Sequence, residues 1–178
     1  MSLEDLEKLI EPSPEGQSKH RPTVVIIDDD PSIRSSLGAV LKDKYTIRTC
    51  TSGLEGVRAV DEHTSCVILD VKMPVHDGFW VCKHLRKRDA DVPIIFHSGY
   101  QDLKDPYEII NEFRPFGYVV KGETLSRLLT LVANAVRHSE RIREGRRTVE
   151  QLRDAREQLR KVYASMPPSD RPSPVPPR

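Results

Sequence analysis

The feature that most constrains this chain is a fivefold alternation of short runs rich in strand-forming residues with stretches of helical periodicity. The runs lie at 24–27, 45–50, 66–69, 93–96 and 117–120. The continuous apolar run at 24–27 is typical of a strand that is buried on both faces, and 66–69 is likewise expected to be a buried strand. Because helical patterns separate the runs, we predict an α/β fold whose five-stranded parallel sheet carries helices on both faces.

Capping signals indicate where several of the helices begin. Ser52 and Glu55 form a capping-box pair in front of one apolar helical face. Asp105 followed by Pro106 is typical of an N-cap and a first helical residue, here of a short helix. After the fifth apolar run, a long helix is expected to start near Glu123.

The helical pattern continues beyond residue 132. Apolar side chains recur there at spacings of three and four, although Arg156 occupies one position of the seam and Gly145 interrupts its approach. We therefore expect a helical extension that could dimerise as a coiled coil. The last twelve residues contain six prolines, which favours a disordered or polyproline-type tail. The predicted boundaries are an N-terminal extension at 1–21, a globular domain at 22–132, the helical extension at 133–165 and the tail at 166–178.

Composition and patterning also bear on location. No apolar run approaches the roughly 20 residues that cross a bilayer. The N-terminus has an amphipathic pattern without the layout of a signal peptide, formed by Leu3, Leu6, Leu9 and Ile10. The three cysteines lie far apart and have no metal-ligand spacing, which is typical of reduced thiols. We expect a cytoplasmic protein with no membrane partner.

Acidic, hydroxyl and basic residues follow four of the five apolar runs. Asp28 and Asp29 follow the first run, Asp70 the third, Ser98 the fourth and Lys121 the fifth. In an open parallel sheet these strand ends meet at one edge, where ligands bind. Converging carboxylates repel one another, and Mg²⁺ relieves that repulsion. A carboxylate can also accept a phosphoryl group while a metal and a lysine neutralise the phosphoryl oxygens. The pattern predicts phosphoryl transfer without a nucleotide-binding part.

Residues 23 to about 132 resemble the receiver domain of two-component response regulators. Four stretches carry the resemblance: VVIIDDDPSIR, VILDVKMPVHDGF, PIIFHSGY and GYVVKGE. The second match is very specific. Physically, Met73-Pro74 rigidifies the loop after Asp70, and Gly78 supplies backbone freedom where the next helix begins. The resemblance implies a flavodoxin-like fold and a signalling switch phosphorylated by a sensor histidine kinase or a phosphotransfer protein. Enzymatic activity would be limited to self-phosphorylation from small donors and self-dephosphorylation.

The resemblance also implies a role for each residue at the sheet edge. Asp70 would be the phosphoacceptor. The Mg²⁺ ligands would be Asp29 directly, Asp28 directly or through water, Asp70, and the backbone carbonyl of Lys72. Ser98 would be the switch hydroxyl, and Lys121 the cation that binds the phosphoryl group. Tyr118 would be the aromatic ring that rotates inward when Ser98 moves.

Three departures from the family pattern lie around the fifth strand. Gly122 follows Lys121 where the family usually has proline, often with a cis bond. A cis bond before a non-proline residue costs about 2.5–4 kcal/mol, so we predict a trans bond. The segment 114–116 replaces the usual Gly-Ala, and Pro106 and Pro115 bracket a helix that looks short. Because these changes fall on the usual output face, the family's typical dimer is not assumed.

Several alternatives stand beside the signalling switch. A phosphatase of the aspartyl-phosphate class normally has a second acid two residues after its nucleophile, where this chain has Lys72. Ten basic against five acidic residues between Leu125 and Tyr163 could bind nucleic acid, but no helix-turn-helix follows and we expect no such partner. His138 lacks the following proline of a phosphotransfer histidine. The chain could also be a fragment of a larger regulator that lacks its effector domain.

Overall fold

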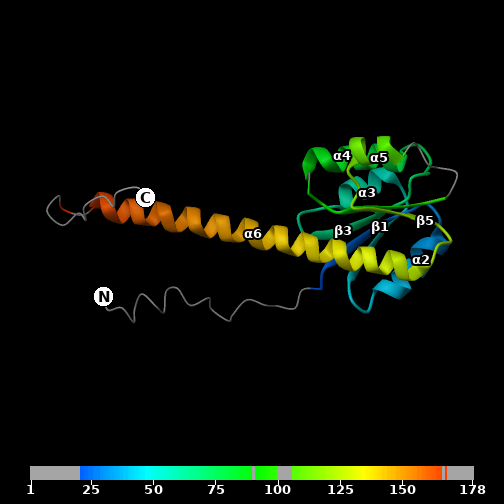
Figure 1. Cartoon of the computed structure of the whole chain (residues 1–178), viewed down its shortest axis with the longest axis horizontal. Coiled ribbons are helices and arrows are strands. Elements are labelled where there is room, and N and C mark those ends of the chain that lie inside the picture. Colours follow the sequence, from blue (N-terminus) through cyan, green and yellow to red (C-terminus); the bar gives the residue numbers. More distant parts are fainter. Residues whose placement is uncertain (1–20, 90, 100–105, 166, 168–178) are drawn as a thin grey trace.

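Strands and helices alternate along the part of the chain that the structure describes. The computed structural model describes residues 21–89, 91–99, 106–165 and 167. Its elements are β1 (Thr23–Ile27), α2 (Pro31–Leu41), β2 (Thr46–Cys50), α3 (Gly53–Ala59), β3 (Thr64–Leu69), α4 (Gly78–Arg88), β4 (Ile94–Ser98), α5 (Pro106–Phe113), β5 (Gly117–Val120) and α6 (Leu125–Ser165) (Figure 1). The expected N-cap Asp105 lies outside the described residues.

All five strands run parallel, in the order β2-β1-β3-β4-β5. This arrangement confirms the predicted flavodoxin-like sheet. The order reverses direction between β1 and β3, where the register pairs Ile27 with Leu69. These two residues immediately precede Asp28 and Asp70, so both acids lie at the switch point where open α/β sheets bind ligands.

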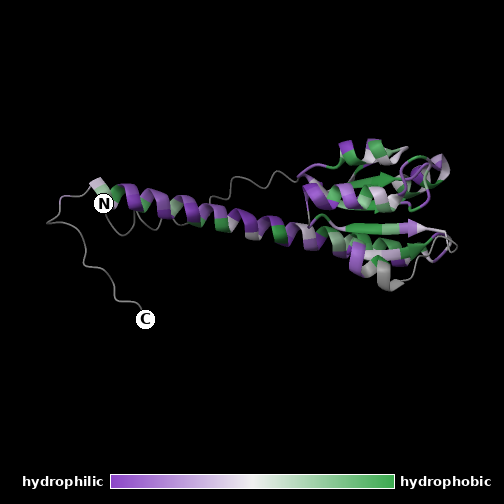
Figure 2. Ribbon diagram, turned by 90° about the horizontal axis from the view of Figure 1, so that it is seen from above, coloured by the Kyte–Doolittle hydropathy of each residue, from purple (hydrophilic) through white to green (hydrophobic). Residues whose placement is uncertain are grey.

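Two helix layers bury the two faces of the sheet. Alternate strand residues point to opposite faces, so Ile26 and Ile68 pack with α2 and α6, whereas Ile27 and Leu69 pack with α3, α4 and α5. Figure 1 shows these layers above and below the strands, and Figure 2 shows hydrophobic residues gathered in the sheet. The cores also hold the three cysteines as buried free thiols, as expected: Cys50, Cys66 and Cys82.

Side-chain caps fix the starts of the helices that lead away from the site. The Ser52 hydroxyl accepts a hydrogen bond from the Glu55 N–H at 3.3 Å, as the capping box predicts. The reciprocal bond differs, because the Glu55 carboxylate accepts from the N–H of Thr51 at 2.6 Å, one residue before the cap. At the start of α4, Asp77 accepts from the N–H of Trp80 at 2.7 Å.

The long helix α6 has two different halves. Its first half packs on β3, β4 and β5 through Leu128, Val132, Ala135 and Val136. The helix continues without a break through Gly145 and then leaves the domain (Figure 1). Its 41 residues correspond to about 60 Å. No helix in the described part of the chain is both long and apolar enough to cross a membrane.

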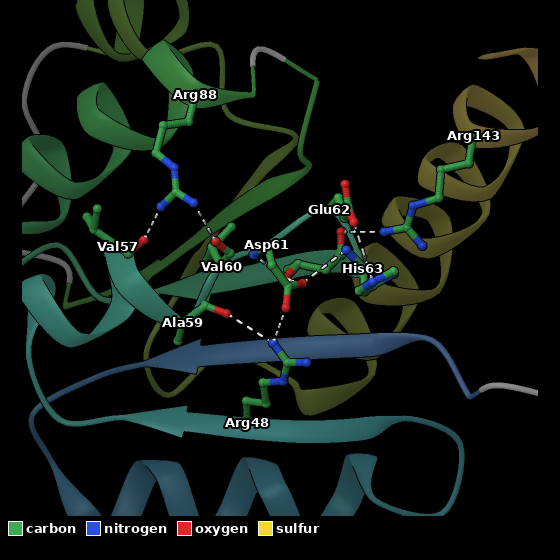
Figure 3. Close-up of polar contacts among 10 residues, drawn as sticks. Arg48, Val57, Ala59, Val60, Asp61, Glu62, His63, Arg88 and Arg143 are labelled. Carbon is green, nitrogen blue, oxygen red and sulfur yellow. Dashed lines mark hydrogen bonds and ion pairs between the residues drawn. The ribbon is translucent and has the colours of Figure 1, made fainter. Parts of the chain in front are cut away.

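Arginines from three elements fasten the amino-terminal end of the sheet (Figure 3). Arg48 of β2, Arg88 of α4 and Arg143 of α6 donate hydrogen bonds to the last turn of α3, to the connection after it and to the start of β3. Arg48 pairs with the Asp61 carboxylate at 2.6 Å. The other acceptors are the Ser65 hydroxyl and the backbone carbonyls of Val57, Ala59, Val60 and Thr64. One turn further along α6, Arg146 pairs with Asp91, so the helix leaves from a fixed base.

Candidate phosphoryl-transfer site

Three carboxylates and one ammonium group meet at the carboxyl end of the sheet. Asp28 and Asp29 follow β1 and Asp70 follows β3, and one oxygen from each lies within 4.8 Å of the others. Lys121 follows β5, and its Nζ lies 2.9 Å from Oδ2 of Asp28 and 2.9 Å from Oδ2 of Asp70. The fold thus brings together four of the residues that the sequence places at separate strand ends.

The three acids differ in exposure and in their partners. Asp28 and Asp70 are buried, whereas Asp29 is exposed. The second oxygen of Asp28 accepts a hydrogen bond from the N–H of Asp30 at 2.9 Å, and that of Asp70 from the N–H of Lys72 at 3.4 Å. The Asp70 carboxylate is therefore held in place from both sides.

The charge at this site is not balanced. Burial raises the pKa of Asp70, and the negative charge of Asp28 adds to that effect against the hydrogen bond from Lys121. Burial alone would lower the pKa of Lys121, but its hydrogen bonds with Asp28 and Asp70 outweigh burial and raise that pKa. Lys121 therefore stays charged while two buried carboxylates share it.

A divalent cation fits this set of groups. Three carboxylates provide the hard oxygen ligands that Mg²⁺ prefers, and one ammonium cannot neutralise them. Burial is the main cause of the raised pKa of Asp70, and the negative charge of Asp28 adds to it. Lys72 lies in the loop next to Asp70, with an exposed side chain. The role of its backbone carbonyl as a fourth ligand stays a prediction.

Gly78 holds the loop after Asp70 close to the strand. Its N–H donates to the carbonyl of Val71 at 2.8 Å. A Cβ at this position would collide with the carbonyl oxygen of Asp70 and lie 2.9 Å from the Cα of Val71. We expected Gly78 to supply conformational freedom, but the only described glycine with a positive φ is Gly122. The missing side chain, and not the backbone angle, is what the site requires of Gly78.

The loop after Lys121 explains why glycine replaces the family's proline. The described residues contain no cis peptide bond, so the predicted trans bond between Lys121 and Gly122 is confirmed. Gly122 has a φ of 95°, a left-handed conformation that a proline, fixed near −65°, cannot adopt. The N–H of Glu123 then closes the turn on the carbonyl of Val120 at 3.1 Å.

The two predicted switch residues lie on neighbouring strands. Ser98 is the last residue of β4 and is fully buried, and its carbonyl accepts from the N–H of Lys121 at 2.8 Å. Tyr118 is paired in register with Phe96, and their ring centroids are 6.4 Å apart. Tyr118 is half-buried. The positions suit a hydroxyl and an aromatic that respond together, and their roles stay predictions.

One residue near the site was not singled out from the sequence. His97 is buried, and burial lowers its pKa, helped by the nearby charge of Lys121. As the neighbour of Ser98 in β4, it faces the opposite side of the sheet. Among the residues that the structure describes, its Nδ1 has no hydrogen-bond partner. The available signal was a titratable residue directly after an apolar run.

Comparison with known proteins identifies the family of the domain. The sequence profile of the response regulator receiver domain matches residues 24–133. The chain belongs to this family. Over 137 residues it is 28% identical to the "DNA-binding dual master transcriptional regulator RpaA" of Synechocystis sp., covering 70% of this chain and 57% of that protein. This receiver chain spans about half the length of the curated relatives it matches.

Solved receiver structures have the same fold. A response regulator receiver domain protein from Clostridium thermocellum superposes with a TM-score of 0.62 at 26% identity, covering 67% of this chain and 98% of that one. The response regulator TrrA of Thermotoga maritima, solved in complex with Mg²⁺-BeF, gives a TM-score of 0.56 at 27% identity, covering 64% and 97%. The family and fold predictions are confirmed.

Proposed function

We propose that this receiver domain is a phosphorylation-controlled switch that accepts a phosphoryl group on the carboxylate of Asp70. The observation that carries the proposal is the ion pair in which Lys121 lies 2.9 Å from both Asp28 and Asp70. Asp70 is a buried nucleophile beside this shared ammonium group, and it would be suited to receive a phosphoryl group once the three carboxylates hold a divalent metal.

The chemistry needs no additional catalytic base. An oxygen of Asp70 attacks the phosphorus of a phosphohistidine donor, a P–O bond forms, and the P–N bond breaks to release the imidazole. Lys121 moves from the carboxylates to a phosphoryl oxygen and stabilises its charge. Mg²⁺ held by Asp28, Asp29, Asp70 and the Lys72 carbonyl would supply positive charge to the phosphoryl oxygens. TrrA, with its Mg²⁺-BeF complex, supports this choice of metal.

Residues of β4 and β5 would respond to the phosphoryl group by changing their positions. The Ser98 hydroxyl would donate a hydrogen bond to a phosphoryl oxygen and so move toward Asp70. Tyr118 would follow into the space that this movement opens, which changes the exposed surface beside β5. The partners of this switch would be a sensor histidine kinase or a phosphotransfer protein on the input side, in the cytoplasm.

The output partner is proposed to be a protein. Two arginines in the middle of α6, Arg143 and Arg146, already donate to Thr64 and Asp91, which leaves fewer basic groups for nucleic-acid phosphates. RpaA is named as DNA-binding, and a longer form of this chain with an effector domain would fit that name. We propose no turnover of other phosphoesters, because Lys72 stands where the corresponding phosphatases have an acid.

Acetyl phosphate labelling tests the proposal. Wild-type protein with Mg²⁺ should give a shifted band on a phosphate-affinity gel, and Asp70→Asn should give none. Asp77→Asn is the matched control, because asparagine caps a helix as well as aspartate does and this cap of α4 lies outside the carboxylate cluster. Labelling of Asp70→Asn at the wild-type rate would overturn the proposal.

A further inference from the structure

Arg34 makes a contact that joins helix α2 to the carboxyl edge of the sheet. It is the fourth residue of α2, and its side chain is half-buried. Its guanidinium nitrogen Nη1 donates a hydrogen bond to the backbone carbonyl of Asp28 at 2.6 Å. This carbonyl lies one residue beyond the last paired position of β1, which is Ile27. Arg34 therefore supplies a donor at the point where the ladder of the sheet ends.

The stability of α2 does not explain why an arginine occupies this position. The positive end of a helix dipole lies at the N-terminus of the helix, so a cation in the first turn is unfavourable there. The cap of α2 is supplied by another residue, because the carboxylate of Asp30 accepts a hydrogen bond from the N–H of Ser32 at 2.7 Å. The contact of Arg34 with Asp28 is therefore the interaction that accounts for its place.

This contact fixes the peptide group between two of the residues assigned to Mg²⁺. The carbonyl of Asp28 belongs to the peptide bond that links Asp28 to Asp29, and a peptide group is planar. A hydrogen bond that holds the carbonyl therefore restricts the backbone torsions on both sides, ψ of Asp28 and φ of Asp29. These two angles decide where the Asp29 side chain points relative to the Asp28 side chain.

The two acids depend on this constraint to different degrees. Asp28 is buried and is held at three further atoms. Its N–H donates to the Cys50 carbonyl at 3.2 Å, and its two carboxylate oxygens contact the N–H of Asp30 and the Nζ of Lys121, each at 2.9 Å. Asp29 is exposed, and within the described part of the chain no hydrogen bond or ion pair holds its carboxylate. The direction of the Asp29 side chain therefore depends on its backbone.

We propose that Arg34 is a positioning residue that orients Asp29 toward Mg²⁺ through the backbone of Asp28. The inference rests on the proposed function, because it takes the three carboxylates as the metal site. A direct electrostatic role of Arg34 would have the opposite sign. A guanidinium group repels a divalent cation, so its removal would then strengthen metal binding. A positioning role predicts weaker binding, and the direction of the change separates the two.

Titration with Mn²⁺ tests the inference in the full chain. Mn²⁺ takes the same carboxylate and carbonyl ligands as Mg²⁺, and the EPR signal of free Mn²⁺ falls as the ion binds. The affinity is therefore measured without any phosphorylation. We expect Arg34→Met to weaken Mn²⁺ binding about tenfold, as loss of one hydrogen bond from a charged donor does. Arg34→Lys should restore most of the affinity, because its ammonium group can still donate to the carbonyl.

Arg143→Met is the matched control. Arg143 also donates to a backbone carbonyl at 2.6 Å, that of Thr64, but at the opposite end of the sheet. Both substitutions remove a bond between a guanidinium group and a carbonyl, and both should lower the free energy of unfolding. Only Arg34→Met should change the Mn²⁺ affinity. In an Asp29→Ala background Arg34→Met should have little further effect, because two residues that act through one contact are not additive.

The contrary results are distinct. Unchanged or tighter Mn²⁺ binding by Arg34→Met, with wild-type protein that binds the ion, would overturn the role of Arg34 and leave the proposed function standing. Equal weakening in Arg34→Met and Arg143→Met would overturn it as well, since affinity would then follow overall stability. Full additivity with Asp29→Ala would show that Arg34 does not act through Asp29. Wild-type protein that binds no Mn²⁺ would remove the metal site itself, and the inference with it.

Discussion

The two ends of the sheet use charged residues in opposite ways. At the amino-terminal end, arginines from three elements donate to backbone carbonyls and to Asp61, so each charge has fixed acceptors. At the carboxyl end, three carboxylates share one ammonium group and the pKa of Asp70 is raised by burial and by Asp28. At the amino-terminal end the arginines have hydrogen-bond acceptors, and these contacts hold the helices in place. The carboxyl end has three carboxylates against one ammonium group, an excess of negative charge that favours a divalent cation.

Removing the shared cation should have the largest effect. Lys121→Met takes away the group that moves to the phosphoryl oxygen, and loss of one such preorganised donor typically slows a reaction about 100-fold or more. We expect acetyl phosphate labelling, followed on a phosphate-affinity gel over time, to slow by that factor. Lys72→Ala is the control, because only its backbone carbonyl is assigned to the site and its side chain is exposed. Equal rates for both variants would contradict the role of Lys121.

Adding one methyl group at the carboxyl end should be costly. Gly78→Ala pushes a Cβ into the Asp70 carbonyl and should lower the free energy of unfolding by about 1–3 kcal/mol, as overpacking does. It should also slow labelling, because Asp70 itself must shift. The measurement is urea unfolding followed by the fluorescence of Trp80.

The matched change in the exposed part of α6 should have the opposite sign. Nothing lies within 4 Å of a Cβ built at Gly145. Gly145→Ala should therefore raise helix stability by about 1 kcal/mol and leave labelling unchanged. A loss of stability in Gly145→Ala would contradict the continuous helix.

Loosening the amino-terminal end should affect stability without affecting chemistry. Arg143→Ala removes hydrogen bonds from a charged donor to Thr64 and Ser65. We expect a loss of about 1.5 kcal/mol in the free energy of unfolding, the lower end for charged hydrogen bonds. The exposed Arg141→Ala should change it little. If Arg143→Ala slowed labelling as much as Gly78→Ala does, the contacts at the amino-terminal end of the sheet would also affect the chemistry at the carboxyl end, which would contradict this separation.

The smallest effect concerns pH. Because burial lowers the pKa of His97, the unfolded chain binds a proton more readily than the folded domain below the ordinary value of 6.5. The free energy of unfolding should therefore fall as pH drops from about 7.5 to about 5.5. His97→Leu should flatten this slope in urea titrations. His63→Gln, whose side chain is 71% exposed, is the control and should keep it. An unchanged slope in His97→Leu would show that other groups cause it.

Sequence patterns predicted the fold and the site in unequal detail. The strand-forming runs predicted all five strands. The polar residues that follow these runs predicted the cluster of Asp28, Asp29, Asp70 and Lys121, because the carboxyl ends of parallel strands lie at one edge of the sheet. The function of Gly78 was misread, since sequence reveals a glycine but not the carbonyl packed against it.

Other features depend on tertiary contacts that no local pattern contains. The arginine contacts at the opposite end join residues up to 79 positions apart, as in the bond from Arg143 to Thr64. The environment of His97 likewise depends on how Lys121 and α6 pack on the sheet.

Chemical mapping of the phosphorylated residue would decide whether Asp70 is the acceptor. Protein treated with acetyl phosphate and Mg²⁺ is reduced with borohydride, which converts an aspartyl phosphate to homoserine, and is then digested and sequenced by mass spectrometry. We predict homoserine at position 70 and none in protein treated without Mg²⁺. Homoserine at position 28 or 29, with Asp70 unmodified, would contradict the assignment of Asp70 as the phosphoacceptor.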